Sequence, residues 1–462
     1  MSKIATPAMI GTSSAVFSLG SLFAAIASIG VPIGAQRFLG KSFSEQKLGD
    51  IKVFVNASLL LVSIGVFGCS MLIFIIYNWV STTYRLDFSL IVVTVILLGS
   101  NVIMTLLRSI MIASLKIKAL APTIIFSSVA KIVLAVILVS FGTGALGISI
   151  SFALYPVLVS ILLAITIAEI FRSIPTSQTE VTFSKSFMNT LVASGASWIP
   201  VVIQSMGYYL GPLLVFGVGG ASKAGIYFIS YSIYTAISAL MLVLFGISYP
   251  VLSAMQDGRK RFASRAMKLS LVICIPLASS LIFYSKQALL LFGPDYVAAS
   301  SSLEILLLSM VPVAFLTGVN TLANAYGKYK EVLIIGIASN IPSALLYFVL
   351  VPISSINGAA ISFTAGSTIG FIVSVYIAKK FEMRIFWKEL ALIFALPTGI
   401  AFAVSHTPIN YLMGIVVTLV MTYILLFTLR IITKADISDS FAMVPDSIVK
   451  PLLKVWDRFY KK

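Results

Sequence analysis

Long apolar stretches alternate along this chain with short polar connections. A helix needs about 20 apolar residues to cross the hydrocarbon core of a bilayer. Hydropathy locates thirteen suitable stretches, and it identifies them better than it defines their ends. The pattern therefore predicts an all-α integral membrane protein. The predicted spans are 8–34, 52–77, 88–113, 121–141, 145–169, 187–216, 224–252, 267–284, 301–325, 331–352, 356–378, 388–405 and 409–430.

The composition agrees with this pattern and excludes a soluble globular protein. Apolar residues make up 59% of the 462 residues and charged residues only 10%, whereas a soluble domain is about 45–50% apolar and about 25% charged. Little sequence remains outside the spans for a catalytic module. The sequence contains no phosphate-binding loop, zinc-ligand spacing or nucleophile elbow, so we expect no cofactor, no metal and no enzymatic activity.

The positive charge predicts an orientation in the membrane. The formal net charge is +17, and alternating spans place 26 of the 32 Lys and Arg residues on one side. The other side receives only Lys3, Arg85, Lys223 and Lys286. Cytoplasmic connections carry the excess of Lys and Arg, so we expect the basic side and the C-terminus to be cytoplasmic, in a cell membrane. The charge thus indicates attraction to anionic headgroups and not nucleic-acid binding.

Short sequence matches predict an internal repeat. Their spacings are similar, at 211 and 212 residues for the two longer matches. The matched spans run in the same direction through the membrane, as in a parallel repeat about an axis along the bilayer normal. The matches are Lys116-Ile-Lys118 with Lys328-Tyr-Lys330, 147–152 with 358–363, and Pro32 with Pro250.

The repeat predicts two pseudo-symmetric six-helix bundles followed by two extra helices. We expect the N-terminal bundle over 1–183, the C-terminal bundle over 184–380, and the extra helices with a basic cytoplasmic tail over 381–462. Only five helices are visible in the first bundle, so its first helix is missing in this interpretation. We therefore expect that the chain starts one helix late, through a truncation or a misplaced start codon. A true thirteen-span protein is the alternative.

Three segments resemble a known family: 20–40, the basic segment that follows 224–252, and 290–296. They are similar to segments of the lipid-linked oligosaccharide (O-antigen-type) flippases, or polysaccharide biosynthesis proteins, of the multidrug/oligosaccharidyl-lipid/polysaccharide (MOP) exporter superfamily. The resemblance covers nearly the whole chain, except for the absent first helix. It implies two bundles that open alternately to each side and flip a polyprenyl-(pyro)phosphate-linked oligosaccharide from the inner to the outer leaflet. Membrane lipids, and glycosyltransferases or polymerases of the same pathway, are the implied partners.

Two basic residues, Lys131 and Arg108, fall within predicted spans. An ionisable group in hydrocarbon is costly and usually faces a partner or a water-filled cavity. Lys131 lies about ten residues into its span, close to the bilayer centre. We expect both residues to bind a pyrophosphate, which Arg contacts bidentately and Lys as a point charge. The alternatives are a structural Lys131 bonded to helix carbonyls and an Arg108 that extends to the interface.

Acidic residues are absent from the middle of the first five spans, whereas a cation-coupled exporter of organic cations needs a buried carboxylate. In the second half only Glu304 lies well inside a span, where it lines a cavity or faces the outer interface. Several neutral polar residues are candidate ligands for sugar hydroxyls, with helix packing and interhelical hydrogen bonds as alternatives. These candidates are Gln204, Tyr208, Tyr231, Tyr234, Asn320, Asn324 and Asn340.

Small residues predict two close helix contacts. Small side chains let membrane helices approach closely, so we favour packing over cavity lining for both sets. The first set follows one face of the span 8–34, and the second is a GxxxG pair in the span 356–378. The two sets are Ser14, Ser18, Ser21, Ala25 and Ser28, and Gly366 with Gly370.

Lipid-linked oligosaccharide flipping is the leading hypothesis for the function. The first alternative is a cation-coupled drug or metabolite antiporter of the same superfamily, which the absent carboxylate disfavours. A membrane glycosyltransferase or ligase is disfavoured by the short outer connections. A non-transporting subunit of a glycan assembly complex stays open as the third alternative.

Overall fold

The computed structural model describes residues 5–44, 48–84, 86–114, 119–172 and 182–431. These residues form helices and connections, with no strand among them. Eleven helices in this part of the chain are long and apolar enough to cross a membrane. Two of them contain a residue with non-helical dihedral angles, Gly220 in α8 (Phe183–Ala254) and Ser355 in α13 (Tyr329–Lys380). Each of these two accounts for two predicted spans, and the predicted all-α membrane fold is confirmed.

Two predicted features lie outside the described residues. They are Lys116 and Lys118 of the repeat and residues 432–462 of the basic tail.

The other helices follow one another along the chain. The remaining elements are α1 (Pro7–Ala27), α2 (Val31–Ser44), α3 (Leu48–Ile75), α4 (Tyr77–Tyr84), α5 (Phe88–Ala113), α6 (Leu120–Ser140), α7 (Gly144–Arg172), α9 (Arg259–Phe283), α10 (Ser285–Leu290), the 3-10 helix η2 (Pro294–Ala299), α11 (Ser300–Leu308), α12 (Met310–Ala325), α14 (Trp387–Ser405) and α15 (Tyr411–Thr428).

The chain packs into two compact units, Met1–Phe228 and Ile229–Lys462. It passes from the first unit to the second within α8. The helix that we expect to open the second repeat, over 187–216, therefore packs in the first unit. The predicted repeat boundary after residue 183 rests on sequence correspondence and stays a prediction.

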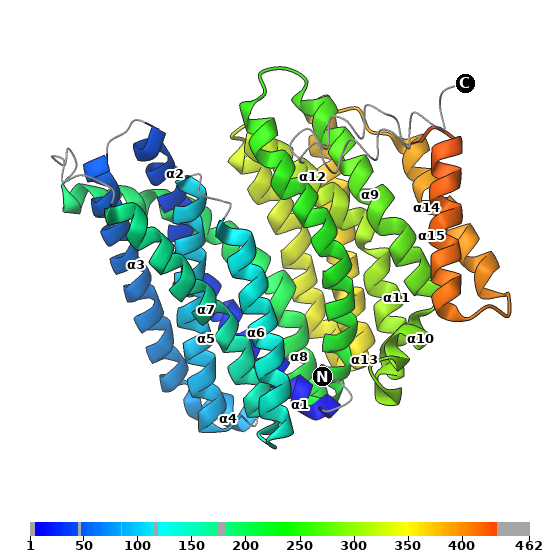
Figure 1. The fold of residues 1–462 in the computed structure, drawn as a ribbon, viewed down its shortest axis with the longest axis horizontal. Coiled ribbons are helices and arrows are strands. Elements are labelled where there is room, and N and C mark those ends of the chain that lie inside the picture. Colours follow the sequence, from blue (N-terminus) through cyan, green and yellow to red (C-terminus); the bar gives the residue numbers. More distant parts are fainter. Residues whose placement is uncertain (1–4, 45–47, 85, 115–118, 173–181, 432–462) are drawn as a thin grey trace. The chain divides into compact units, whose positions relative to one another are not determined.

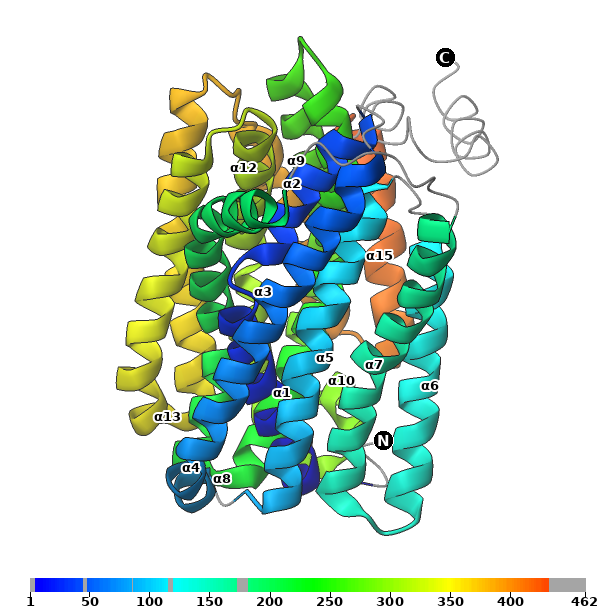
Figure 2. The same ribbon diagram turned by 90° about the vertical axis from the view of Figure 1, so that its left-hand side faces the viewer.

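In the first unit, α5 contacts α1, α2, α3 and α7, and α6 contacts α7. Figure 1 and Figure 2 show α3, α5, α6 and α7 side by side, with α4 at one end of this unit and α2 at the other. One face of α6 carries large exposed apolar side chains, among them Ile125, Val129 and Ile132. Such a face suits contact with lipid, whereas α5 contributes many residues to the interior of the unit.

A turn at residues 28–30 interrupts the first predicted span. Ile29 and Gly30 have positive φ angles of 50° and 71° between α1 and α2. The Trp198 Nε1–H donates a hydrogen bond of 3.0 Å to the carbonyl oxygen of Ile26, beside the turn. The expectation of one continuous span over 8–34 is therefore wrong. Hydropathy stays high because the turn residues are largely apolar, but it does not register a left-handed backbone turn.

In the same unit, α1 crosses the final part of α8 at very short distance. A Cβ atom on Gly11 would collide with the carbonyl oxygen of Ala221, and one on Gly225 with the carbonyl oxygen of Pro7. Reciprocal glycines therefore let the two backbones pack directly against each other, as small residues do at other membrane helix contacts.

In the second unit, α9 contacts α11, α12, α14 and α15, and α12 also contacts α13. The GxxxG pair forms a close contact between the two halves of α13, as predicted. A Cβ atom on Gly366 or Gly370 would collide with atoms of Ser339 or Ser343. The small residues thus hold the hairpin of α13 together.

Basic connections of the second unit meet at one end of it. Lys260 near the start of α9 pairs with Glu382 after α13, with 2.9 Å between Nζ and Oε2. Arg259 donates a 3.1 Å hydrogen bond from Nη1 to the carbonyl oxygen of Ala325 at the end of α12. Three connections that the alternation of spans assigns to the basic side are therefore neighbours.

The glycine crossing between α1 and α8 can be tested by overpacking. We expect Gly225→Leu to lower the free energy of unfolding by about 1–3 kcal/mol, because the added side chain must displace the backbone of α1. Thermal unfolding of the purified protein in detergent measures the effect. Gly68→Leu is the matched control, since Gly68 is exposed on α3 and a Cβ atom there has open space. Equal loss of stability in both variants would contradict the tight crossing.

Candidate functional site

The first unit contains a cavity of about 310 Å³ lined by residues of α1, α2, α5 and α8. It lies beside the turn at residues 28–30, and Ser28 and Gly30 contribute to its wall. Hydroxyl and amide groups alternate there with small apolar side chains, so the cavity offers hydrogen bonds without a fixed charge. Its polar lining consists of Ser21, Ser28, Asn101, Thr105, Ser205 and Tyr209.

The second half of the small-residue face of α1 lines this cavity. Ser21, Ala25 and Ser28 border it, whereas Ser14 is fully buried in helix packing. Our preference for packing is therefore wrong for these three positions. The physical reason is the turn at 28–30, because a helix that stops there leaves space beside its last turns that a continuous helix would fill.

Arg108 continues the polar face of α5 beyond the cavity. Asn101, Thr105 and Arg108 are spaced i, i+4 and i+7, which places them on one face of the helix. Asn101 and Thr105 line the cavity, and Arg108 does not. Its side chain is half-buried and has no ion-pair partner among the described residues. An unpaired guanidinium thus lies about one helical turn from the cavity wall.

Lys131 lies over two aromatic rings of α7. Its Nζ is 5.7 Å from the ring centroid of Phe152 and 5.5 Å from that of Tyr155. Lys131 shares a face of α6 with Ser127 and Ala135, which are both buried. A desolvated cation–π contact contributes about 2 kcal/mol, so the rings, and not helix carbonyls, stabilise this ammonium. Lys131 does not line the cavity.

The rings beneath Lys131 lead to the cavity. Phe152 packs against Phe17 with 5.4 Å between ring centroids, and Phe17 packs against Tyr209 at 5.9 Å. Tyr209 lines the cavity, and its hydroxyl is hydrogen-bonded to Ser21. One cluster of aromatic rings therefore connects the ammonium group to the cavity wall.

The predicted residues on α8 lie one position away from those that line the cavity. Tyr208 is hydrogen-bonded to Gln204, and neither residue borders the cavity, whereas the adjacent Ser205 and Tyr209 do. One position along a helix is a rotation of about 100°. The candidates on α8 therefore lie on the same turns of the helix as the cavity-lining residues, but on a different face, and their role in binding stays a prediction.

Tyr231 and Tyr234 belong to the core of the second unit. Their ring centroids are 6.0 Å apart, and both rings contact Phe363, at 6.2 and 5.3 Å. Both side chains are buried. Their aromatic contacts correspond to the packing alternative for the tyrosine pattern.

The remaining candidates of the second unit are used in three different ways. Asn340 donates hydrogen bonds to Gly336 O and Ser339 Oγ within its own helix. The Oδ1 of Asn320 is buried without a hydrogen-bond partner among the described residues, and Asn324 lies one turn further along α12. Glu304 accepts a hydrogen bond from the Ser285 hydroxyl of α10. These contacts do not unite the four residues in one site.

Carboxylates do not contribute to the cavity. The described acidic residues of the first unit are Asp50, Asp87 and Glu169, which lie near helix ends. No group of three or more His, Cys, Asp and Glu residues in the described ranges has the arrangement of a metal site. Arg108 and Lys131 are therefore the charged residues at membrane depth among the described residues of this unit, and both are cationic.

The fold agrees with solved transporter structures. The lipid II flippase MurJ in its inward closed conformation matches with a TM-score of 0.64 and 16% identity, over 92% of this chain and 96% of that chain. An inward-facing multidrug resistance MATE family transporter of the MOP superfamily matches with a TM-score of 0.61 and 13% identity, over 81% and 94%.

A third match is a MOP superfamily transporter from Pyrococcus furiosus, described as having a binding pocket of reverse polarity that suggests a different function. Its TM-score is 0.54 and its identity 17%, over 81% of this chain and 93% of that chain. No family model and no curated protein matches this sequence. The chain therefore has the two-lobed helical fold of MOP superfamily transporters and is a multi-pass membrane protein.

Water access to the cavity can be tested with a cysteine probe. In a background where Cys69 and Cys274 are replaced by Ala, we expect Asn101→Cys to react at least about tenfold faster than Leu98→Cys with a water-soluble methanethiosulfonate, because the reagent needs an exposed thiolate. Leu98 lies on the same helix and is fully buried. Mass spectrometry after timed labelling gives both rates. Equal rates would show that the cavity is closed to water.

Proposed function

We propose that this chain is a transporter that flips a polyprenyl-(pyro)phosphate-linked oligosaccharide from the inner to the outer leaflet of the cell membrane. One observation carries the proposal. The first unit has two cations at membrane depth, Arg108 and Lys131, and no carboxylate at that depth among its described residues. A transport site with this charge attracts a phosphate-bearing substrate and repels an organic cation.

The cavity is suited to part of such a substrate. Its volume of about 310 Å³ is at the lower limit of ligand pockets, which span about 300–1,000 Å³. It therefore suits a pyrophosphate and an adjoining sugar, not a whole oligosaccharide. In this proposal Asn101 and Thr105 bond sugar or phosphate oxygens, and Arg108 on the same helix face bonds the phosphate bidentately.

Lys131 acts at a distance in this proposal. Its ammonium group lies over the rings of Phe152 and Tyr155, and the ring faces attract a positive charge where hydrocarbon alone would disfavour it. A cation in a medium of low dielectric constant acts over a longer range than one in water. We infer that Lys131 raises the affinity of the first unit for an anion without touching it.

The structural neighbours are consistent with either an exporter or a flippase. One of them is named as a lipid II flippase and another as a multidrug resistance transporter. Charge favours the flippase, because a cation-coupled antiporter needs a carboxylate that binds its coupling ion. Transport then proceeds by alternating access, and glycosyltransferases or polymerases of the same pathway supply or consume the glycan. This proposal includes cytoplasmic placement of the basic connections and the C-terminus.

A flipping assay tests the role of the two cations. In proteoliposomes that contain a labelled lipid-linked oligosaccharide, an impermeant glycosidase reports how much substrate has crossed the bilayer. We expect Arg108→Gln and Lys131→Met each to slow flipping at least about tenfold. Arg108→Gln removes a hydrogen bond to a charged group, which contributes about 1.5–3 kcal/mol, and Lys131→Met removes the longer-range attraction of a cation in a medium of low dielectric constant. Methionine retains the long apolar stem, so it separates the charge of Lys131 from its packing.

Lys223→Gln is the matched control, because Lys223 is an exposed lysine of the same unit, after the break at Gly220. We expect this variant to flip at the unmodified rate. Unchanged flipping in both membrane-depth variants would exclude a cationic substrate site. Proton- or sodium-driven export of an organic cation, with no flipping by the unmodified chain, would instead identify an antiporter.

A further inference from the structure

The second unit carries a strongly basic cavity that transport by the first unit does not explain. Its volume is about 790 Å³, and it lies where the start of α9, the connection after α13 and the start of α14 come together. Six cationic and two acidic side chains line it, an excess of four positive charges. The cations are Lys260, Arg261, Arg265, Lys268, Arg384 and Lys388.

Two contacts hold the connection after α13 against α9. Lys260 pairs with Glu382 at 2.9 Å, and the Ser264 hydroxyl donates a 3.0 Å hydrogen bond to the carbonyl oxygen of Arg384. The hydrogen bond from Lys260 holds the pKa of the Glu382 carboxyl below its usual value, so the pair stays charged at neutral pH. The backbone that carries Arg384 is therefore positioned before any ligand binds.

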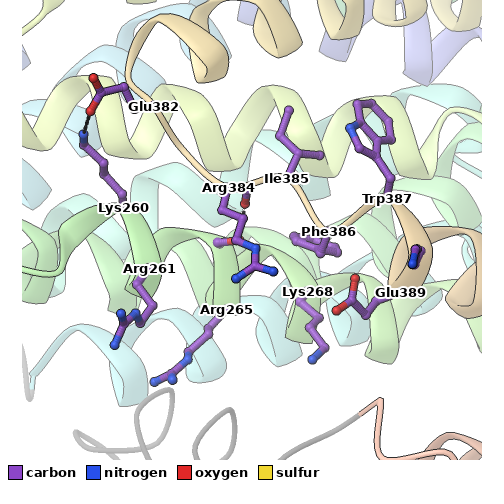
Figure 3. Close-up of a pocket in the computed structure, with 12 residues that line it drawn as sticks. Lys260, Arg261, Arg265, Lys268, Glu382, Arg384, Ile385, Phe386, Trp387 and Glu389 are labelled. Atoms are coloured by element: carbon purple, nitrogen blue, oxygen red, sulfur yellow. Dashed lines mark hydrogen bonds and ion pairs between the residues drawn. The ribbon is translucent and has the colours of Figure 1, made fainter.

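The cationic side chains converge on one side of this connection. Figure 3 shows Arg261, Arg265, Arg384 and Lys268 extending toward the same side of the view, while Lys260 points away from them to Glu382. Arg261 and Arg384 are exposed. Three guanidinium groups in one place form a receptor for phosphate oxygens, because each can donate two parallel hydrogen bonds.

The depth of the cavity indicates a lipid headgroup. α9 has 25 residues and is about 37 Å long, whereas the hydrocarbon core is about 30 Å thick. The excess of about 7 Å corresponds to the first turn of α9, which carries Arg261 and extends into the headgroup layer, and the long side chains of Arg265 and Lys268 can reach that layer from the next turns. Trp387 at the start of α14 is 48% exposed, and Trp is typical of the membrane–water interface.

The wall of the cavity also continues into a surface for acyl chains. Lys388 lines the cavity, and Leu392 follows it at i+4 on α14, with an exposure of 40%. Residues with this spacing share one helix face. A lipid whose phosphate lies among the arginines can therefore lay a chain along α14, which a soluble phosphate cannot do.

From these observations we propose that this basic cavity binds the phosphate headgroup of an anionic phospholipid in the leaflet on the basic side of the membrane. The site is distinct from the cavity of the first unit and does not depend on the transported substrate. A bound lipid would fasten α9 to α14 through the connection that carries Arg384. Glu389, which also lines the cavity, disfavours headgroups with further negative charge on that side.

Native mass spectrometry of the delipidated full chain tests the proposal. Phosphatidylglycerol is titrated as the anionic lipid and phosphatidylcholine as the neutral lipid. We expect the triple variant Arg261→Gln, Arg384→Gln and Lys388→Gln to bind phosphatidylglycerol at least about tenfold more weakly, since each Lys or Arg near a membrane surface contributes about 1 kcal/mol. Thermal unfolding in phosphatidylcholine micelles verifies that the variant is folded.

The matched control removes three exposed lysines at the same end of the second unit but outside the cavity: Lys328→Gln, Lys330→Gln and Lys379→Gln. We expect it to bind phosphatidylglycerol within about twofold of the unmodified chain. This control removes as many charges as the first triple variant, but it leaves every cation of the cavity in place. Equal weakening in both triple variants would overturn the proposal in favour of general surface charge. Displacement of phosphatidylglycerol by millimolar inorganic phosphate would overturn the lipid assignment in favour of a soluble anion.

Discussion

The absence of water from the hydrocarbon core is the constraint on which this structure depends. Every backbone N–H and C=O group at that depth needs a partner within the protein, so the spanning segments are helices. A helix end exposes carbonyl groups that have no partner in the helix. At the end of α1 the indole of Trp198 donates to the carbonyl of Ile26. One side chain of α8 thus helps to make an interrupted helix, and the cavity beside it, compatible with the membrane.

The interruption explains why a polar cavity forms here and not along a continuous helix. Small side chains at the end of α1 do not fill the space beside the turn, and hydroxyl and amide groups of α5 and α8 face it. Farther from the turn, Gly11 and Gly225 bring α1 and α8 into backbone contact. The same helix therefore packs tightly in its first half and lines a cavity in its second half. Composition along α1 changes little between these two parts, whereas their surroundings differ, because the backbone of α8 touches the first half and the turn at 28–30 follows the second half.

This distinction sets the limit of what the sequence could predict. Apolar length identifies the spans because burial in lipid acts on each segment separately. The spacing of Gly366 and Gly370 identifies a close helix contact because the two glycines lie on one face of a single helix. The left-handed turn at Ile29 is not encoded in hydropathy. The choice of Ser205 and Tyr209 over Gln204 and Tyr208 depends on the rotation of α8 in the packed unit. Long-range packing determines both features, and no local pattern reports it.

Depth also determines how this protein stabilises positive charge. At the headgroup layer, Arg261 and Arg384 remain exposed, and water supplies most of their solvation. At membrane depth Lys131 has no such solvent, and the rings of Phe152 and Tyr155 take its place. A ring attracts a cation without neutralising it, whereas a carboxylate would cancel its charge. Contact with aromatic rings therefore leaves the positive charge of a buried lysine able to attract an anion. For Lys131, this contact favours attraction of a phosphate over a purely structural role.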